Sequence, residues 1–467
     1  MATRVDSKSI RKNISVAIIA QAVSLATAFV FNLIVPKFIP IEQYSSWQTF
    51  ALYLSYVGVL HFGLLDGLML RYSHYDYDEL DKPKFRSQFI LLLLIIGFLT
   101  IGGCVISFFI DDVFTGKILF LVSIGILSKN LFTYNSYTFQ LTNRITHYAS
   151  LTIVHRLIMG SVIILLILCG VTDFVWFCLA ELIADFLSSV LCSFYNKGLY
   201  FGKLVPWNEM KDDFFLNVQS GIQLLIANWA SMLLVGSARM IIQWHYDLIT
   251  FGKVSFAFSL TNLFLSFITS ISIVLFPSIK RISNDALPDL YARIRGIVSP
   301  FLFAVILFYF PGAYILSMWL PEYNQSLVYL GILLPMIVFS SKVMLLTNNY
   351  LKAYRKERAM LKINTLSMLG AISFFMLSAY VIDNLYVLIL SVLFSVALRS
   401  IYSEAIVSKL IGKSFIKEHL VELILTIIFV IAATRFSLLE GAFVYLLPLL
   451  AYLIYNFKSQ IFKIKTI

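Results

Sequence analysis

Fourteen long apolar stretches run through this chain of 467 residues, and the short loops between them alternate between basic and nearly uncharged. Most stretches have about 20 residues, enough for a helix to cross a hydrocarbon core about 30 Å thick. A backbone in lipid must satisfy its own hydrogen bonds, so helices are the expected spanning form. The pattern predicts an all-α polytopic membrane protein with about 14 transmembrane helices. We place the spans near residues 13–35, 47–70, 88–110, 117–139, 148–170, 174–196, 216–238, 253–276, 297–319, 327–350, 362–382, 385–407, 419–436 and 440–457.

The composition agrees with a surface that faces lipid. Hydrophobic residues make up 60% of the chain and charged residues 13%, whereas a soluble protein keeps about a quarter of its residues charged. None of the four cysteines belongs to a CxxC pair. We therefore expect reduced, buried cysteines rather than disulfides or metal ligands.

The basic residues indicate the orientation. Of the 36 Lys and Arg residues, 27 lie at the two termini or in every second loop. By the positive-inside rule, both termini are expected in the cytoplasm. The net charge of +11 then reflects topology and contact with anionic lipid, and not nucleic-acid binding. The opposite side carries only Lys37, Lys117, Arg239, Lys253 and Arg435.

The region that opens at Asn13 resembles the region that opens at Asn217, about six spans later. Each region begins with a helix that carries a stripe of polar residues. Each then continues with an apolar helix that ends in a basic cluster. Because both copies start on the same side, the echo indicates a parallel repeat, with chance convergence of two membrane hairpins as the alternative. The repeat predicts a six-helix lobe over 1–200, a second over 201–415, and two additional transmembrane helices over 416–467.

A few cations lie inside the predicted spans. A charge at mid-bilayer costs roughly 2.5–3.5 kcal/mol, so it should face protein or water. Two of these cations, Lys129 and Lys342, lie in the fourth spans of the two predicted lobes, one in each. This symmetry favours a cationic cavity for an anionic cargo such as a phosphate over snorkelling. The predicted substrate-binding cations are Lys129, Arg156, Lys342 and Arg399, with Arg239 near the outer end of the seventh span.

Polar and acidic residues complete the predicted site. Asp66, Glu181 and Asp185 are candidates for ion coupling, and a structural bridge from Arg156 to either of the latter two is the alternative. Hydroxyl and amide groups on the first and seventh spans would line the cavity, or would instead join helices to each other. This polar lining is predicted at Gln21, Ser24, Asn32, Gln223, Asn228 and Trp229, the tryptophan being expected to stack on a sugar or to pack in the core.

Catalytic patterns are absent from the sequence. The segment IGKS (411–414) resembles the end of a phosphate-binding loop, but Val407 stands where that loop requires glycine. The six histidines show no metal-binding spacing, and no loop is long enough for a catalytic domain; the longest predicted loops are 197–215 and 277–296. We expect a transporter without a cofactor, driven by an ion gradient, the membrane potential or the cargo gradient.

Several segments, in this order and spacing, resemble a known family. The segments RKN (11–13), EQYSSWQTF (42–50), GLLDGLMLRY (63–72) and FPSIKR (276–281) together resemble the O-antigen flippases, the Wzx-type polysaccharide transporters of the MATE-like multidrug/oligosaccharidyl-lipid/polysaccharide exporter superfamily. Relatives often have Leu-Gly and a later glycine where this chain has Ile39-Pro40 and Ser45. The turn after the first span is therefore expected to differ.

The resemblance implies a fold of two six-helix lobes around a cavity that opens alternately to each side. The cargo would be an undecaprenyl-pyrophosphate-linked oligosaccharide, crossing from the cytoplasmic to the periplasmic leaflet of a bacterial inner membrane during lipopolysaccharide biosynthesis. A polysaccharide polymerase and a chain-length regulator would be partners, and the two extra helices would accommodate the lipid tail. The alternatives are an ion-coupled multidrug exporter of the MATE type and a membrane glycosyltransferase or polymerase.

Overall fold

The computed structural model describes residues 19–280 and 286–465, and within these ranges every regular element is a helix. The basic residues of the N-terminus and Arg281 lie outside the described residues. In the described part, eleven helices are long and apolar enough to cross a membrane, and two bent helix pairs raise that number to 13. Helix α19 (Ile416–Arg435) has 20 residues, and its acidic and basic side chains keep it out of that number. With α19 the fold agrees with the predicted polytopic all-α protein of about 14 spans.

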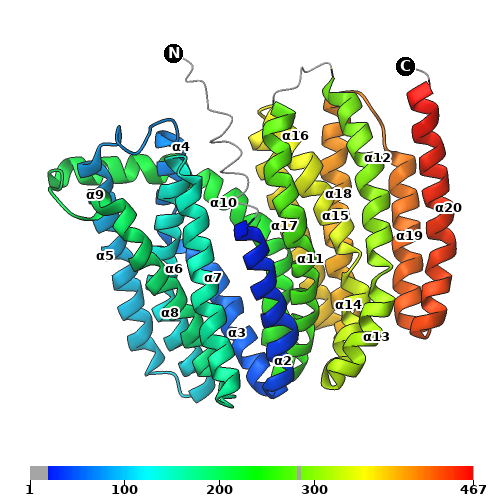
Figure 1. Ribbon diagram of the computed structural model, residues 1–467, viewed down its shortest axis with the longest axis horizontal. Coiled ribbons are helices and arrows are strands. Elements are labelled where there is room, and N and C mark those ends of the chain that lie inside the picture. The colour runs from blue at the N-terminus through cyan, green and yellow to red at the C-terminus, as the bar shows by residue number, and fades with distance from the viewer. Residues whose placement is uncertain (1–18, 281–285, 466–467) are drawn as a thin grey trace. The chain divides into compact units, whose positions relative to one another are not determined.

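The chain forms two compact units, Met1–Trp229 and Ala230–Ile467. Helices α5 to α8 run side by side in the first unit (Figure 1). The boundaries predicted from the internal repeat, at 200 and 415, remain a prediction. The described helices of the first unit are the span Ile19–Phe38 with its π-helical turn Val30–Ile34 and α2 (Val35–Phe38), α3 (Ile41–Val57), the 3-10 turn Gly58–His61, α4 (Leu64–Tyr72), α5 (Lys82–Ser107), α6 (Val113–Leu141), α7 (Ile145–Leu168), α8 (Phe174–Ser193), the 3-10 turn Phe194–Asn196, α9 (Lys197–Tyr200) and the first part of α10 (Trp207–His245).

The second unit contains the remainder of α10 and the helices that follow it. Helices α17 and α18 pack against each other, as do α19 and α20. The described elements are α11 (Leu248–Lys280), α12 (Leu287–Ile306), α13 (Tyr309–Trp319), the 3-10 turn Pro321–Tyr323, α14 (Asn324–Leu333), α15 (Met336–Lys342), the π-helical turn Val343–Thr347, α16 (Asn348–Ala353), α17 (Glu357–Met376), the π-helical turn Leu377–Val381, α18 (Leu385–Ile411), α19 and α20 (Leu438–Lys465).

The predicted loops 197–215 and 277–296 are largely helical. Helix α10 begins at Trp207 and has 39 residues, and α12 begins at Leu287. A helix of that length exceeds the hydrocarbon thickness, because each residue adds about 1.5 Å. Charged residues near the predicted span ends therefore lie inside helices. Arg295, for example, lies within α12.

The second span is broken. Its two parts, Ile41–His61 and Leu64–Tyr72, meet at an angle of 54°. Phe62 and Gly63 at the break both have positive φ, of 51° and 83°. A Cβ on Gly67 would lie 1.9 Å from the carbonyl oxygen of Asn217, so α4 and α10 cross backbone to backbone. Only small residues permit such an approach between membrane helices.

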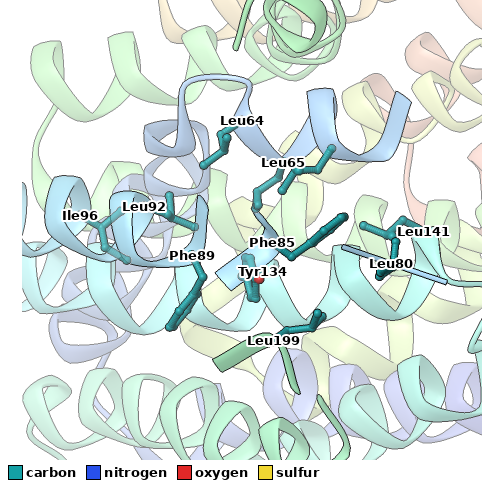
Figure 2. Close-up of a cluster of buried hydrophobic side chains, with 11 residues drawn as sticks. Leu64, Leu65, Leu80, Phe85, Phe89, Leu92, Ile96, Tyr134, Leu141 and Leu199 are labelled. Carbon is teal, nitrogen blue, oxygen red and sulfur yellow. The ribbon is translucent and has the colours of Figure 1, made fainter. Parts of the chain in front are cut away.

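A cluster of buried apolar side chains fixes the short helix α4 in the first unit (Figure 2). Leu64 and Leu65 of α4 pack against Phe85 and Phe89 of α5, with the ring of Tyr134 from α6 between them. The Arg71 guanidinium of α4 donates to Asp213 Oδ1 at 2.9 Å and to Asn217 Oδ1 at 2.6 Å on α10. The break in the second span is therefore enclosed by α5, α6 and α10.

The tenth span is also broken, in the second unit. The parts Pro321–Leu333 and Met336–Ala353 meet at 43°, with Pro335 between them. Proline removes a backbone donor and clashes with the preceding turn, which explains the bend. A π-helical turn directly follows Lys342. Such turns are frequent at functional sites.

Candidate functional site

Three helices of the first unit bring predicted site residues together in one charged cluster. The ammonium nitrogen of Lys129 on α6 lies 3.4 Å from Oδ2 and 3.5 Å from Oδ1 of Asp185 on α8. Asp185 is fully buried, and Nε2 of His155 on α7 lies 3.0 Å from its Oδ1. The Lys129 side chain keeps 28% of its surface exposed. The cluster therefore joins a buried acid to a cation that remains partly accessible.

Two further predicted residues border this cluster. Arg156 follows His155 on α7 and is half-buried, as is Glu181 one turn before Asp185 on α8. Arg156 and Glu181 lie close enough to interact electrostatically. The alternative, a bridge from Arg156 to either acid, is not formed among the described residues; Asp185 instead contacts Lys129 and His155. Arg156 is thus a cation near acids but without an ion pair.

Lys342 lies in a sealed cluster of the second unit. Its ammonium nitrogen is 2.7 Å from a carboxylate oxygen of Glu404 on α18 and 2.7 Å from one of Glu422 on α19, and all three residues are 0% exposed. Arg295 on α12 donates from Nε to Glu404 at 2.7 Å, and its Nη2 lies 3.0 Å from Glu422. Two cations and two acids balance each other. The expectation of an open cationic position at Lys342 is therefore corrected.

A tyrosine and a histidine complete this cluster. The Tyr291 hydroxyl of α12 donates to Glu404 at 2.8 Å. The ring nitrogens of His419 on α19 lie 3.4 Å from Glu404 and 3.7 Å from Glu422. Buried ion pairs thus join helices α12, α15, α18 and α19. Such a buried pair is costly to break, since removal of one partner leaves an uncompensated charge.

Sequence reasoning missed three of these residues for identifiable reasons. Arg295 lies in the predicted loop 277–296, because the ninth span is predicted to start at residue 297. In the structure α12 starts at Leu287, so Arg295 lies within a helix. Glu422 lies within the predicted span 419–436 and was visible as an acid in an apolar stretch. His155 was equally visible within the fifth span, next to Arg156. An intramembrane ionisable residue is by default a functional candidate, so the signal existed.

The remaining predicted cations lie elsewhere in the second unit. Arg399 of α18 donates from Nη2 to Ser231 Oγ on α10 at 2.8 Å, and its Nε has no hydrogen-bond partner. Among the described residues no carboxylate forms an ion pair with Arg399. Arg239 of α10 donates to Ser255 Oγ on α11 at 3.3 Å. Arg399 is therefore a half-buried guanidinium with unused hydrogen-bonding capacity.

The residues of the predicted polar lining on the first span are half-buried, and those on α10 are exposed. Asn32 donates from Nδ2 to the Ala28 carbonyl of its own helix at 2.7 Å and lies in the π-helical turn of the first span. Trp229, the last residue of the first unit, is 38% exposed. Gln21 and Ser24 are half-buried, and Gln223, Asn228 and Trp229 are exposed on α10.

Asp66 lies directly after the break in the second span. It is 2% exposed, and its Oδ1 accepts from the Tyr137 hydroxyl of α6 at 3.3 Å. Its Oδ2 lies 3.8 Å from Nε2 of His61 and has no hydrogen-bond partner. His61 Nδ1 accepts from the backbone N–H of Gly63 at 3.1 Å. The predicted ion-coupling acids therefore lie at two different places in the first unit.

No group of three or more His, Cys, Asp or Glu residues in the described part of the chain could hold a metal ion. All four cysteines are free.

Comparison with known proteins relates the fold to membrane transporters. No protein-family model matches this chain, and no curated protein is significantly similar to it. A structure of lipid II flippase MurJ in an inward closed conformation superposes with a TM-score of 0.68 at 14% identity, covering 96% of this chain and 99% of MurJ. An inward-facing multidrug resistance MATE family transporter of the MOP superfamily gives 0.64 at 11% identity, covering 82% of this chain and 94% of its own. The chain therefore has a multi-pass helical fold similar to that of MurJ and of this MATE transporter, as the resemblance predicts.

Proposed function

We propose that this protein is a flippase for an undecaprenyl-pyrophosphate-linked oligosaccharide, an O-antigen or similar repeat unit. It would move its cargo from the cytoplasmic to the periplasmic leaflet of a bacterial inner membrane by alternating access, with both termini in the cytoplasm. A polysaccharide polymerase and a chain-length regulator would act on the product. The observation that carries this proposal is Arg399 of α18, which forms no ion pair with any acid of the described residues.

An unpaired guanidinium within the span formed by α18 needs a compensating interaction. Its transfer from water is costly, and the Ser231 hydroxyl offers one neutral hydrogen bond in return. A guanidinium binds phosphate oxygens through two parallel hydrogen bonds, which suits a pyrophosphate. An exporter of cationic drugs would gain nothing from a cation at this position. Arg399 therefore favours an anionic cargo.

The structural neighbours support a lipid cargo. The MurJ structure, named as a lipid II flippase, covers 96% of this chain, whereas the MATE structure covers 82%. In this proposal the partly accessible Lys129, Arg156 and Arg239 also contact acidic groups of the cargo. Lys342 acts indirectly, by keeping α15 in place against α18 and α19.

The test compares full-length variants in the native host from which the chromosomal copy has been removed. Arg399→Gln should lower surface polysaccharide about 10–100-fold, since hydrogen bonds to a charged group contribute about 1.5–3 kcal/mol. Lipid-linked repeat units should accumulate in the cytoplasmic leaflet, and Arg399→Lys should be intermediate. Arg435→Gln, which removes an exposed cation at the end of α19, is the matched control.

Wild-type polysaccharide in cells that contain normal amounts of the Arg399→Gln protein would refute this role of the arginine. Loss of resistance to cationic drugs, with unchanged polysaccharide on deletion of the wild-type gene, would instead identify a drug exporter.

A further inference from the structure

Asp66 differs from the other buried acids of the described chain. The carboxylates of Asp185, Asp213, Glu404 and Glu422 each form an ion pair with a lysine or arginine. Asp66 is equally buried, yet in the described residues its one ion-pair partner is a histidine. An uncompensated buried carboxylate is costly, so such a group carries a proton or binds a cation.

The neutral ring of His61 cannot compensate a negative charge on Asp66 in this geometry. Nδ1 of His61 accepts a hydrogen bond from the Gly63 N–H, so in the neutral ring the hydrogen is on Nε2. That Nε2 faces Oδ2 of Asp66 across 3.8 Å, which is beyond hydrogen-bond distance. An ionised carboxylate would draw a neighbouring N–H donor to roughly 2.7–2.9 Å in this environment. The separation therefore fits a protonated Asp66.

The groups around the pair are otherwise neutral or already paired. From α6 the Tyr137 hydroxyl faces Asp66. From α4 and α10, Arg71 and Asp213 face each other. The side that faces α5 is formed by the apolar cluster of Figure 2. Among the described residues, no lysine or arginine forms an ion pair with Asp66.

A sodium ion is less suited to this place than a proton. At a broken membrane helix, sodium is coordinated by backbone carbonyls that the break releases. Here the Val57 carbonyl accepts from Asn130 Nδ2 at 3.1 Å, and the Val59 carbonyl accepts from the Phe62 N–H at 2.9 Å. The donor Nε2–H of His61 also points toward Asp66, where it would repel a metal cation.

We propose that Asp66 and His61 form a proton-binding site at the break in the second span, with the proton on Asp66. Release of the proton makes the carboxylate an acceptor for His61 Nε2–H, and the two side chains close their gap. Because they lie on opposite sides of the 54° bend, closure changes the angle between α3 and α4. Proton release is thereby coupled to the shape of the second span. Its use in driving transport rests on the proposed function, whereas the binding site itself does not.

The test is infrared spectroscopy of the purified full-length protein in lipid nanodiscs, titrated from acid to alkaline pH. Protein labelled with carbon-13 at the aspartate carboxyl should show a protonated aspartic acid band that disappears as the pH rises. The band should be missing in Asp66→Asn. It should persist in Asp213→Asn, because Asp213 is paired with Arg71.

A substitution of the histidine separates its two roles. In His61→Asn the side-chain oxygen can still accept from the Gly63 N–H, but the Nε2–H donor is lost. The titration midpoint of Asp66 should then rise by about one pH unit, since the carboxylate loses a hydrogen bond to its charged form. An unchanged midpoint would show that His61 is only a backbone cap.

Two results would overturn the proposal. Wild-type labelled protein without a titrating aspartic acid band would show that Asp66 stays in one state. Saturable loss of the band on addition of NaCl at fixed pH, absent in Asp66→Asn, would identify a sodium site instead. If the band is assigned to Asp66 but polysaccharide export in Asp66→Asn cells is normal, the proton site stands and its coupling to export fails. If deletion of the wild-type gene leaves polysaccharide unchanged, the proposed function alone fails.

Discussion

The sealed cluster of Arg295, Lys342, Glu404 and Glu422 in the second unit predicts how two substitutions change the free energy of unfolding. Glu422→Gln removes one of two negative charges and leaves the cations of Arg295 and Lys342 facing Glu404 alone. Breaking a buried pair by removal of one partner costs about 3–5 kcal/mol. A second substitution that restores the balance, Lys342→Met, should recover most of that loss.

The expected change in melting temperature follows from the size of the unit. The second unit, 230–467, has 238 residues. At about 2.1 cal/mol/K per residue, its unfolding entropy is about 0.5 kcal/mol/K. Glu422→Gln should therefore lower Tm by about 6–10 °C. The double variant keeps the pair of Arg295 with Glu404 and should melt above Glu422→Gln alone.

The assay is thermal unfolding of the full chain in a single detergent, followed by the loss of helical circular dichroism, because all four cysteines lie in the first unit and a thiol-reactive dye would not report on the second. Glu418→Gln, one turn earlier on α19, is the control, because in the described structure Glu418 forms no ion pair. Losses that simply add in the double variant would refute charge balance as the source of stability. A Tm for Glu422→Gln equal to that of the control would refute the buried pair itself.

Three further predictions concern other helices. Gly67→Ala should greatly reduce the folded protein recovered, because its Cβ would meet the Asn217 carbonyl oxygen at 1.9 Å; Gly97→Ala, with nothing within 4 Å, should instead stabilise by about 0.5–1 kcal/mol, and size-exclusion profiles distinguish them. Tyr445→Phe loses a hydrogen bond to the Phe303 carbonyl at 2.9 Å and should cost about 1 kcal/mol in thermal unfolding. The Thr115 hydroxyl and N–H hold the pKa of Asp112 below its usual range. Asp112→Asn should therefore be less stable than wild type at neutral pH, and the difference should vanish as the pH falls through that lowered pKa; a constant difference would contradict this.

The spans and their orientation-bearing charges could be predicted because they depend on local composition. An apolar stretch of about 20 residues needs no partner to be recognised. The site depends on partners that are distant in sequence. Lys342 and Glu422 are 80 residues apart, and Lys129 and Asp185 are 56 apart. Hydropathy contains no information about which helices touch, so the pairing could not be predicted.

The broken second span illustrates a further limit. The predicted span 47–70 treats most of GLLDGLMLRY (63–72) as the end of one continuous helix. Gly63 alone permits a turn there but does not require it. The turn follows from the crossing of α4 with α10 at Gly67, which is a tertiary contact. Asp66 is recognisable in the sequence as an intramembrane acid, whereas only the structure shows that no lysine or arginine of the described residues pairs with it.

The cluster around Lys342 has a consequence for the order of synthesis. Arg295, Lys342 and Glu404 enter the membrane before α19 is made, so the nascent unit contains one excess positive charge until Glu422 arrives. A chain that stops before residue 416 would keep that charge in lipid. Helix α19 therefore supplies the charge that neutralises a bundle made before it, and a relative without this helix would need a different residue at Arg295 or Lys342. On this basis, truncation at residue 415 should yield an unstable protein that is degraded during biogenesis.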